Sequence, residues 1–399
     1  MQLNSPANDW AALDRAPSDL AASGSVEVRE DGEWLAELAT LHFELRVERK
    51  NPLVHLWSDE RNLTRRVLRV KENAGDRIVL EVQRFGRAKR GAIEGLRFFV
   101  PQGISQRLRE RLLAFSASLR AEIYEMREPD AAMQKIDPAD AGNLESWLVP
   151  RDQLESVLRA ASETITRIRA MLPSNADAIQ CRAPAAANEV ALTFHGMQFA
   201  RWTRQGVFFG LGNSTEMLTT SNERALERLL HQLDLHRSPL ATDANHALYR
   251  GAPERWLESI VLEDPAKLDA LLDTRHFYSQ VPALAAGDRG VLDLLGITRQ
   301  GRLVVIELKA SEDLQLPVQA VDYWLRVRRH QREGDFQRDG YFAGVAIDPQ
   351  PPLVWLVSPG LRFHSATDTL LKYLSPEIHI TRIGLAENWR RGLKIIFRQ

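Results

Sequence analysis

GVLDLLGITRQGRLVVIELK, residues 290–309, carries charged side chains within two otherwise apolar runs. The runs 290–297 and 303–308 each read as a strand that is buried on both faces. Asp293 lies in the first run, Glu307 lies in the second, and Lys309 follows directly. Because a carboxylate in such a strand is costly without a partner or a metal, the three charges need a joint explanation. Catalysis is the leading one.

The loop between these strands predicts how the charges meet. Residues 299–301 suit a three-residue hairpin loop in which Gly301 takes the left-handed conformation. If the residues that flank the loop pair with each other, Asp293 lies opposite Glu307 with Cβ atoms about 4.5–5.5 Å apart. Lys309 shares that face, since it follows two residues later. This arrangement suits Mg²⁺ or Mn²⁺, whereas a slip of one residue would turn Asp293 to the other side.

Two motifs flank the hairpin. LPVQAVDY (316–323) places Gln319 and Tyr323 on one helix face, and ERWLESIVLEDP (254–265) predicts a helix from 253 to about 262. On that helix the apolar positions mark a core face, with Glu254 at its edge and Glu258 pointing further away. Glu254 is therefore the candidate acid, although a solvated carboxylate near a helix N-terminus would look the same.

These motifs, taken in order, resemble the PD-(D/E)xK nuclease superfamily, and in particular its RecB-like and NucS-like branches. The resemblance covers roughly residues 250–348, with Leu292 at the position that gives the family its proline. It implies a restriction-endonuclease-like αβββαβ core and Mg²⁺-dependent (or Mn²⁺-dependent) hydrolysis of phosphodiester bonds.

Asp293 and Glu307 would hold the metal ion, with the backbone carbonyl of Leu308 as a further ligand. Lys309 would orient or activate the attacking water and offset developing negative charge. The alternative is a structural cluster of carboxylates and a lysine, which non-catalytic relatives of many enzymes retain.

The flanking motifs would complete the site. The resemblance gives Glu254 the role of an additional acid and gives Gln319 a role in ordering the site or contacting substrate, with Tyr323 beside it. A surface or capping glutamine and an ordinary core tyrosine are the alternatives.

Composition limits the other readings. The chain has 399 residues, 44% of them hydrophobic, and no apolar run approaches the length of a membrane helix. Cys181 is the single cysteine, which excludes an intrachain disulfide and favours a reducing cytoplasm. Neither a P-loop nor a dinucleotide fingerprint is present, and the histidines lack metal-ligand spacing.

The expected partner is nucleic acid. The net charge of −1 does not indicate a polyanion binder, but residues 44–120 hold 18 Lys and Arg against 9 Asp and Glu. Arg87, Lys89 and Arg90 in RFGRAKRG (84–91) suit backbone binding, or form an exposed charged loop. DNA is favoured over RNA only by analogy with the family. A membrane partner is not expected, and a homo-oligomer remains open.

The predicted class is a multidomain α+β or α/β protein with three regions. Residues 1–130 form a β-rich and then helical region, with strands over 41–84 and a helix over 106–126. Residues 140–240 form a small α+β region with a helix over 144–172, a linker over 173–188, a three-stranded meander over 190–211 and a helix over 222–235. Residues 248–399 form the nuclease-like domain.

Within residues 248–399 the first helix precedes three strands, at 277–281, 290–297 and 303–308. A helix over 316–329 and a strand over 341–347 complete the αβββαβ order. Further elements are expected near 353–357, 368–373, 378–383 and 393–397.

Two rivals remain open. One is a nucleic-acid-binding or scaffold protein that keeps this fold without activity. The other is an enzyme that acts on a different substrate, with the basic region a coincidence.

Overall fold

The computed structural model describes residues 146–183, 188–282, 284–285, 291–365 and 367–399, and before them strands β1–β8 with residues 109, 112–116 and 137. These residues combine helices with several sheets, which confirms a mixed α and β class. The chain forms two compact units. The first comprises residues 1–144 and 366–376, and the second comprises residues 145–365 and 377–399.

The first unit is rich in strands, as predicted. A five-stranded sheet has the order β2 (Phe43–Val47), β3 (Leu53–Ser58), β6 (Gly95–Pro101), β7 (Ala121–Arg127) and β8 (Ala132–Ile136). A three-stranded sheet has the order β1 (Trp34–Leu35), β5 (Arg77–Glu81) and β4 (Val70–Asn73). Helix α9 (Thr367–Lys372) belongs to the same unit.

The helix predicted over 106–126 is wrong in its second half, where strand β7 begins at Ala121. β7 pairs with β6 on one side and with β8 on the other, and Ile123 is fully buried. Pairing with two distant segments therefore outweighs the local helical spacing.

The second unit contains a five-stranded antiparallel sheet, in the order β10 (Ile179–Arg182), β11 (Glu189–Phe194), β12 (Met197–Thr203), β13 (Gly206–Leu211) and β14 (Ser214–Met217). The three predicted strands are confirmed, together with the turns at Gly196 (φ +77°) and Gly206 (φ +141°). Helices α3 (Arg151–Ala170) and α4 (Glu223–His236) pack on this sheet.

Two boundaries in this region were predicted wrongly. Helix α3 begins at Arg151 and not at 144, because Pro150 caps it with an extended backbone and residues 146–147 form strand β9, paired with β16 (Leu284–Ala285). The linker expected over 173–188 contains a 3₁₀ helix, η3 (Pro173–Ala178), and strand β10. Two apolar residues of this segment, Ala178 and Ile179, are buried.

A six-stranded sheet forms the rest of the unit, in the order β15 (Leu272–Pro282), β17 (Val291–Thr298), β18 (Leu303–Leu308), β19 (Leu353–Pro359), β20 (His379–Leu385) and β21 (Ile395–Arg398). The β15–β17–β18 pairs are antiparallel, the β18–β19–β20 pairs are parallel, and β21 is antiparallel to β20. The strand predicted over 341–347 is absent from this described segment. Gly340 and Gly344 (φ +78° each) and Phe342 (φ +56°) form turns there.

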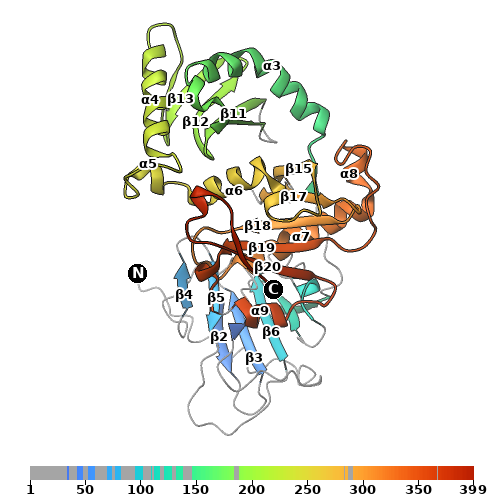
Figure 1. Ribbon diagram of the computed structural model, residues 1–399. Helices are drawn as coiled ribbons and strands as arrows, with labels where there is room; N and C mark the ends of the chain where they lie inside the picture. Colours follow the sequence, from blue (N-terminus) through green and yellow to red (C-terminus); the bar gives the residue numbers. More distant parts are fainter. Residues whose placement is uncertain are drawn as a thin grey trace. The chain divides into compact units, whose positions relative to one another are not determined.

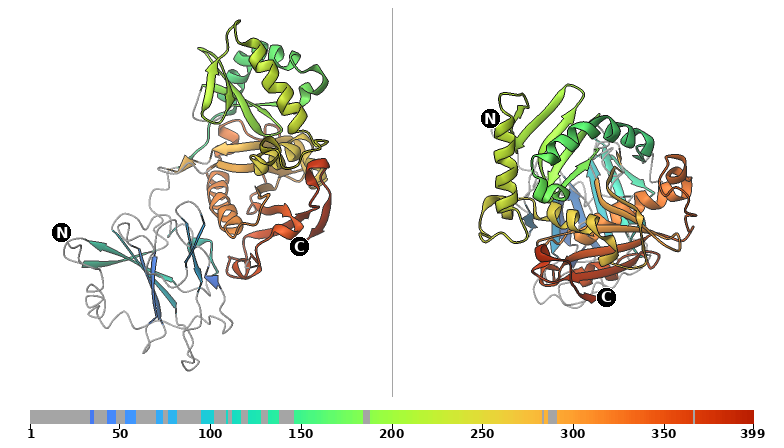
Figure 2. Two further views of the ribbon diagram at one scale, coloured as in Figure 1. Left: turned by 90° about the vertical axis from the view of Figure 1, so that its left-hand side faces the viewer. Right: turned by 45° about the horizontal axis from the view of Figure 1, so that its top comes forward.

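Helices cover both faces of the six-stranded sheet. Trp256 and Leu257 of α6 (Pro253–Glu263) share a core with Val304 and Ile306 of β18, while α7 (Leu316–Glu333) packs along β18 and β19. Every residue of β18 is buried. Helix α6 lies between this sheet and the five-stranded sheet β10–β14 (Figures 1 and 2).

Within the described part of the chain, no helix combines the length and the apolar character that crossing a lipid bilayer requires.

Candidate metal centre

The hairpin at the centre of the six-stranded sheet has the predicted register. Leu294 pairs with Ile306 and Ile297 pairs with Leu303, and the Thr298 N–H donates to the carbonyl of Arg302 at 2.8 Å. Gly301 adopts φ +89°, and a Cβ there would come 2.2 Å from the carbonyl oxygen of Ala346. Glycine is thus required both by the loop conformation and by the close backbone approach.

The two carboxylates lie on one face of the sheet. Leu294, Ile306 and Leu308 belong to the core beneath α6, so the alternate residues Asp293 and Glu307 face the side of α7. The backbone ladder ends at the Leu294–Ile306 pair, and beyond it Asp293 Oδ2 accepts the Leu308 N–H at 3.1 Å. Because the N–H and C=O of a strand residue point to the same side, the Leu308 carbonyl is directed toward Asp293.

Glu307 is buried with its charge only partly compensated. Its side chain is 3% exposed, and Lys309 Nζ lies 3.6 Å from Oε1. The same ammonium lies 3.6 Å from Asp313 Oδ2, so one cation is shared by two carboxylates. Oε2 makes no hydrogen bond among the described residues. Burial, followed by the charge of Asp293, raises the pKa of Glu307 well above its usual value.

Asp293 is also poorly compensated. Burial and then the charge of Glu258 raise the pKa of this partly buried carboxyl to about 6. The Leu308 N–H, Lys309 and Arg255 act in the opposite direction without cancelling the rise. Two adjacent carboxylates that both resist ionisation in the metal-free protein form an electrostatic environment that a cation would relieve.

The acids of α6 are arranged differently from the prediction. Glu258, expected to point away from the core, is 1% exposed, while Glu254 is only partly buried and accepts a hydrogen bond from Ser311 Oγ at 3.4 Å. The prediction for Glu258 failed because the five-stranded sheet β10–β14 covers the second side of α6. Glu258, and not Glu254, influences Asp293 electrostatically.

One residue of the second motif, Tyr323, lies near the two carboxylates. Burial, followed by the charges of Glu307 and Asp293, raises the pKa of Tyr323 above its usual range. The Oε1 atom of Gln319 is buried and accepts no hydrogen bond within the described residues. The structure thus brings Tyr323 to the candidate site and leaves Gln319 with an unsatisfied acceptor on the preceding helix turn.

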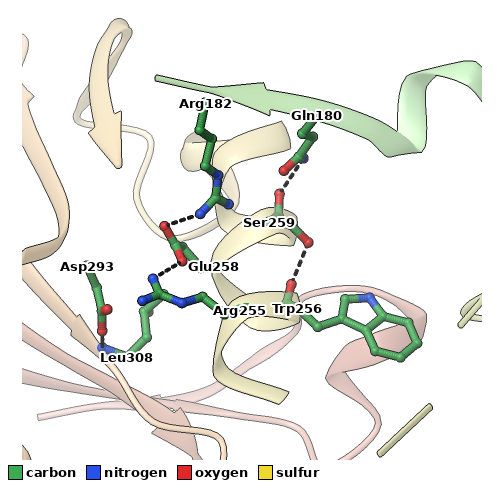
Figure 3. A network of polar contacts seen from close by, with 8 residues as sticks. All are labelled: Gln180, Arg182, Arg255, Trp256, Glu258, Ser259, Asp293 and Leu308. Carbon is green, nitrogen blue, oxygen red and sulfur yellow. Dashed lines mark hydrogen bonds and ion pairs between the residues drawn. The ribbon is translucent and has the colours of Figure 1, made fainter. Parts of the chain in front are cut away.

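Sequence reasoning missed three residues of this neighbourhood: Arg182, Arg255 and Asp313. Arg255 and Arg182 donate hydrogen bonds to Glu258 (Figure 3). Asp313 shares Lys309 with Glu307. Lys309 and Asp313 meet in the irregular segment between β18 and α7, where the sequence shows no periodic pattern that predicts the contact. Arg182 carried no signal either, because it reaches α6 from a strand 76 residues earlier in the chain.

A second cluster with metal-ligand chemistry lies at the end of α7. His330, Glu333 and Asp335 offer ligand atoms within 4.8 Å of one another. His330 Nδ1 lies 2.5 Å from Asp335 Oδ2, and Arg338 and Arg329 pair with Asp335 and Glu333 at 2.7 and 2.9 Å. Protein partners thus already engage these groups.

Of the basic segments that could contact nucleic acid, only the end of α7 is described. Arg87, Lys89 and Arg90 lie outside the described residues. At the end of α7, Arg328 donates to the carbonyl of Pro349 at 2.7 Å, and Arg329 pairs with Glu333. These two arginines are therefore engaged in contacts within the chain.

The donor set fits a hard divalent cation. Two carboxylates on one face and a nearby backbone carbonyl are the oxygen ligands that Mg²⁺ and Mn²⁺ prefer, and one buried Glu307 oxygen has no hydrogen bond within the described part of the chain. In comparisons with known proteins, the chain matches no family model and no curated protein.

Proposed function

We propose that this protein is a metal-dependent nuclease that hydrolyses phosphodiester bonds, with DNA as its substrate. The observation that carries the proposal is the pair Asp293 and Glu307 on one face of a central hairpin, with both pKa values raised: that of Asp293 by burial and the charge of Glu258, and that of Glu307 by burial and the charge of Asp293. Proteins arrange uncompensated carboxylates of this kind where a cation is to be bound.

The order of elements supports a restriction-endonuclease-like core. α6 precedes β15, β17 and β18, and α7 and β19 follow, which is the αβββαβ order that the sequence resemblance implies. The fourth strand of this order is β19 and not the segment 341–347. The acids lie on the second and third strands, as the resemblance requires.

Each side chain has a role in this proposal. Asp293, Glu307 and the Leu308 carbonyl would hold Mg²⁺ or Mn²⁺. The bound ion would supply charge stabilisation and lower the pKa of a coordinated water. Lys309, held between Glu307 and Asp313, orients the attacking water and offsets negative charge that develops on the phosphate.

The flanking residues support the same centre. Tyr323 approaches from α7, and Gln319 one helix turn earlier would use its buried oxygen, which has no hydrogen bond among the described residues, to order a water or a substrate group. Glu258 of α6 takes the place that the sequence suggested for Glu254, because it is the α6 carboxylate that influences Asp293. Glu254 lies at the more exposed edge of the same helix.

The proposal is tested by cleavage of linear, branched and single-stranded DNA with Mg²⁺ or Mn²⁺. Wild-type protein should cleave at least one of these substrates, while Glu307→Ala and Lys309→Ala should be inactive and remain folded. Glu312→Ala is the matched control, since this carboxylate is nearby but 57% exposed. If the wild type neither cleaves nor binds Mn²⁺, the chain is instead a scaffold or binding protein with this fold. RNA cleavage without DNA cleavage would reassign the substrate.

A further inference from the structure

An ionic network links the five-stranded sheet β10–β14 to the candidate metal centre. Arg182, the last residue of β10, donates from Nη1 to Glu258 Oε1 at 2.9 Å. Arg255, one helix turn before Glu258, donates from Nη1 to Oε2 at 2.9 Å. Each carboxylate oxygen is thus held by a different guanidinium (Figure 3).

The network is buried where it crosses between the sheet and α6. The side chain of Glu258 is 2% exposed and that of Arg182 is 12% exposed, whereas that of Arg255 is 42% exposed. Breaking a buried ion pair by removing one partner is strongly unfavourable, because the other charge stays in a low-dielectric environment. The position of Glu258 therefore depends on Arg182 as well as on its own helix.

This network acts electrostatically on the candidate metal centre. Figure 3 shows the Arg255 side chain between Glu258 and Asp293. Burial, followed by the charge of Glu258, raises the pKa of Asp293, whereas Arg255 lowers it. Burial lowers the pKa of the Arg255 guanidinium, but the charge of Glu258 and then those of Asp293 and Tyr323 raise it. The two arginines and Glu258 therefore contribute to the field in which the metal would bind.

Docking α6 on the sheet does not by itself require these charges. The neighbouring Gln180 donates to the Ser259 carbonyl at 3.2 Å, which joins the same strand to the same helix without a charged group. Apolar contacts can replace buried ion pairs of this kind with little loss of stability. A role beyond docking is a reason to retain a charged pair beside the metal centre.

We propose that Arg182 is a positioning residue for the metal centre. The five-stranded sheet β10–β14 then contributes a residue on which the geometry of the site depends. Together with Arg255, Arg182 holds Glu258 away from direct coordination of the ion. The inference rests on the proposed function, since it assigns Arg182 a role in the same cation site.

Loss of Arg182 should separate metal affinity from turnover. The site gains one net negative charge, so Mn²⁺ should bind as tightly as in wild type or a few-fold more tightly. Without the hydrogen bond from Arg182, Glu258 can turn toward the ion and change its coordination. Cleavage at saturating Mn²⁺ should therefore fall about tenfold or more.

The experiment compares Arg182→Ala with Gln180→Ala. Both variants remove a hydrogen bond between β10 and α6, but only the first removes a charge next to Glu258. Mn²⁺ affinity by electron paramagnetic resonance, the cleavage rate at saturating Mn²⁺ and thermal unfolding are measured for each. Arg182→Lys should recover part of the rate. Arg182→Gln, which keeps a donor near Glu258, replaces the alanine variant if that variant does not fold.

The outcomes separate the two proposals. A rate loss confined to Arg182→Ala, with undiminished Mn²⁺ affinity, supports the positioning role. If Arg182→Ala behaves like Gln180→Ala, or if its affinity and rate fall together with stability, the positioning role is wrong while the nuclease assignment stands. If wild-type protein binds no Mn²⁺ and cleaves nothing, the nuclease assignment is wrong, and the role of Arg182 is overturned with it.

Discussion

Replacing Asp293 with asparagine should stabilise the metal-free protein at neutral pH. Burial and the charge of Glu258 raise the pKa of this carboxyl from 3.8 to about 6. At pH 7.5 the folded protein must therefore keep Asp293 ionised in an environment that disfavours the charge. Asparagine removes that charge, and its side-chain oxygen can still accept the Leu308 N–H.

The size of the effect follows from the pKa shift. A rise of about two pKa units corresponds to about 3 kcal/mol at 1.36 kcal/mol per unit, and partial solvent access reduces this to about 1–3 kcal/mol. The direction of the pH dependence follows from the linkage between proton binding and folding. Because the folded-state pKa of Asp293 is the higher one, protonation favours folding: this contribution is complete below pH 3.8 and is lost as the pH rises through about 6.

Chemical denaturation with EDTA present, at pH 7.5 and at pH 4.5, measures the prediction. Asp293→Asn should raise the free energy of unfolding at pH 7.5, and its advantage over wild type should shrink at pH 4.5. Asp273→Asn is the contrasting control. Arg275 lowers the pKa of Asp273 to about 2, so the charged form is favoured and asparagine should destabilise. If Asp293→Asn destabilises at pH 7.5 like the control, Asp293 is a structural carboxylate and the argument for a cation site fails.

Three further predictions concern metal binding and the packing around α6. Mn²⁺ affinity, measured by titration calorimetry, should weaken about tenfold or more between pH 7.5 and pH 5, since Asp293 must lose its proton to bind; a flat profile would contradict its raised pKa. Arg237→Met should cost about 3–5 kcal/mol in denaturation, because the buried guanidinium donates to carbonyls in two segments, and a loss below about 1 kcal/mol would refute that role. Gly196→Ala places a Cβ 1.9 Å from the Arg255 carbonyl at φ +77°, so both the unfolding temperature and the cleavage rate should fall, and an unchanged unfolding temperature would contradict this contact.

Local sequence was sufficient for the hairpin. The two apolar runs, the loop residues and Gly301 fix the pairing of adjacent strands, so the register followed from counting. The positions of α6 and α7 followed from their apolar spacing and from Pro253 and Pro317 at their starts. Each of these features depends on residues close together in the chain.

The errors arose where distant segments decide the structure. Glu258 read as an outward-facing residue because the pattern of α6 shows one apolar face, but strand β10 covers its second side. The aromatic run at 341–347 read as a strand, yet Tyr341 and Phe342 pack against Tyr278 and Phe336 within a turn. Only the assembled fold shows which partners such segments have.

Two carboxylates of this fold are equally buried but differently compensated. Glu258 and Glu307 are 1% and 2% exposed. Each oxygen of Glu258 accepts a charged hydrogen bond at 2.9 Å, so two arginines compensate its charge. Glu307 instead shares Lys309 with Asp313 at 3.6 Å, faces Asp293 and keeps one oxygen without a hydrogen bond among the described residues. Burial alone therefore does not identify a functional acid, whereas burial without compensation, next to a second acid in the same state, points to a ligand that completes the site.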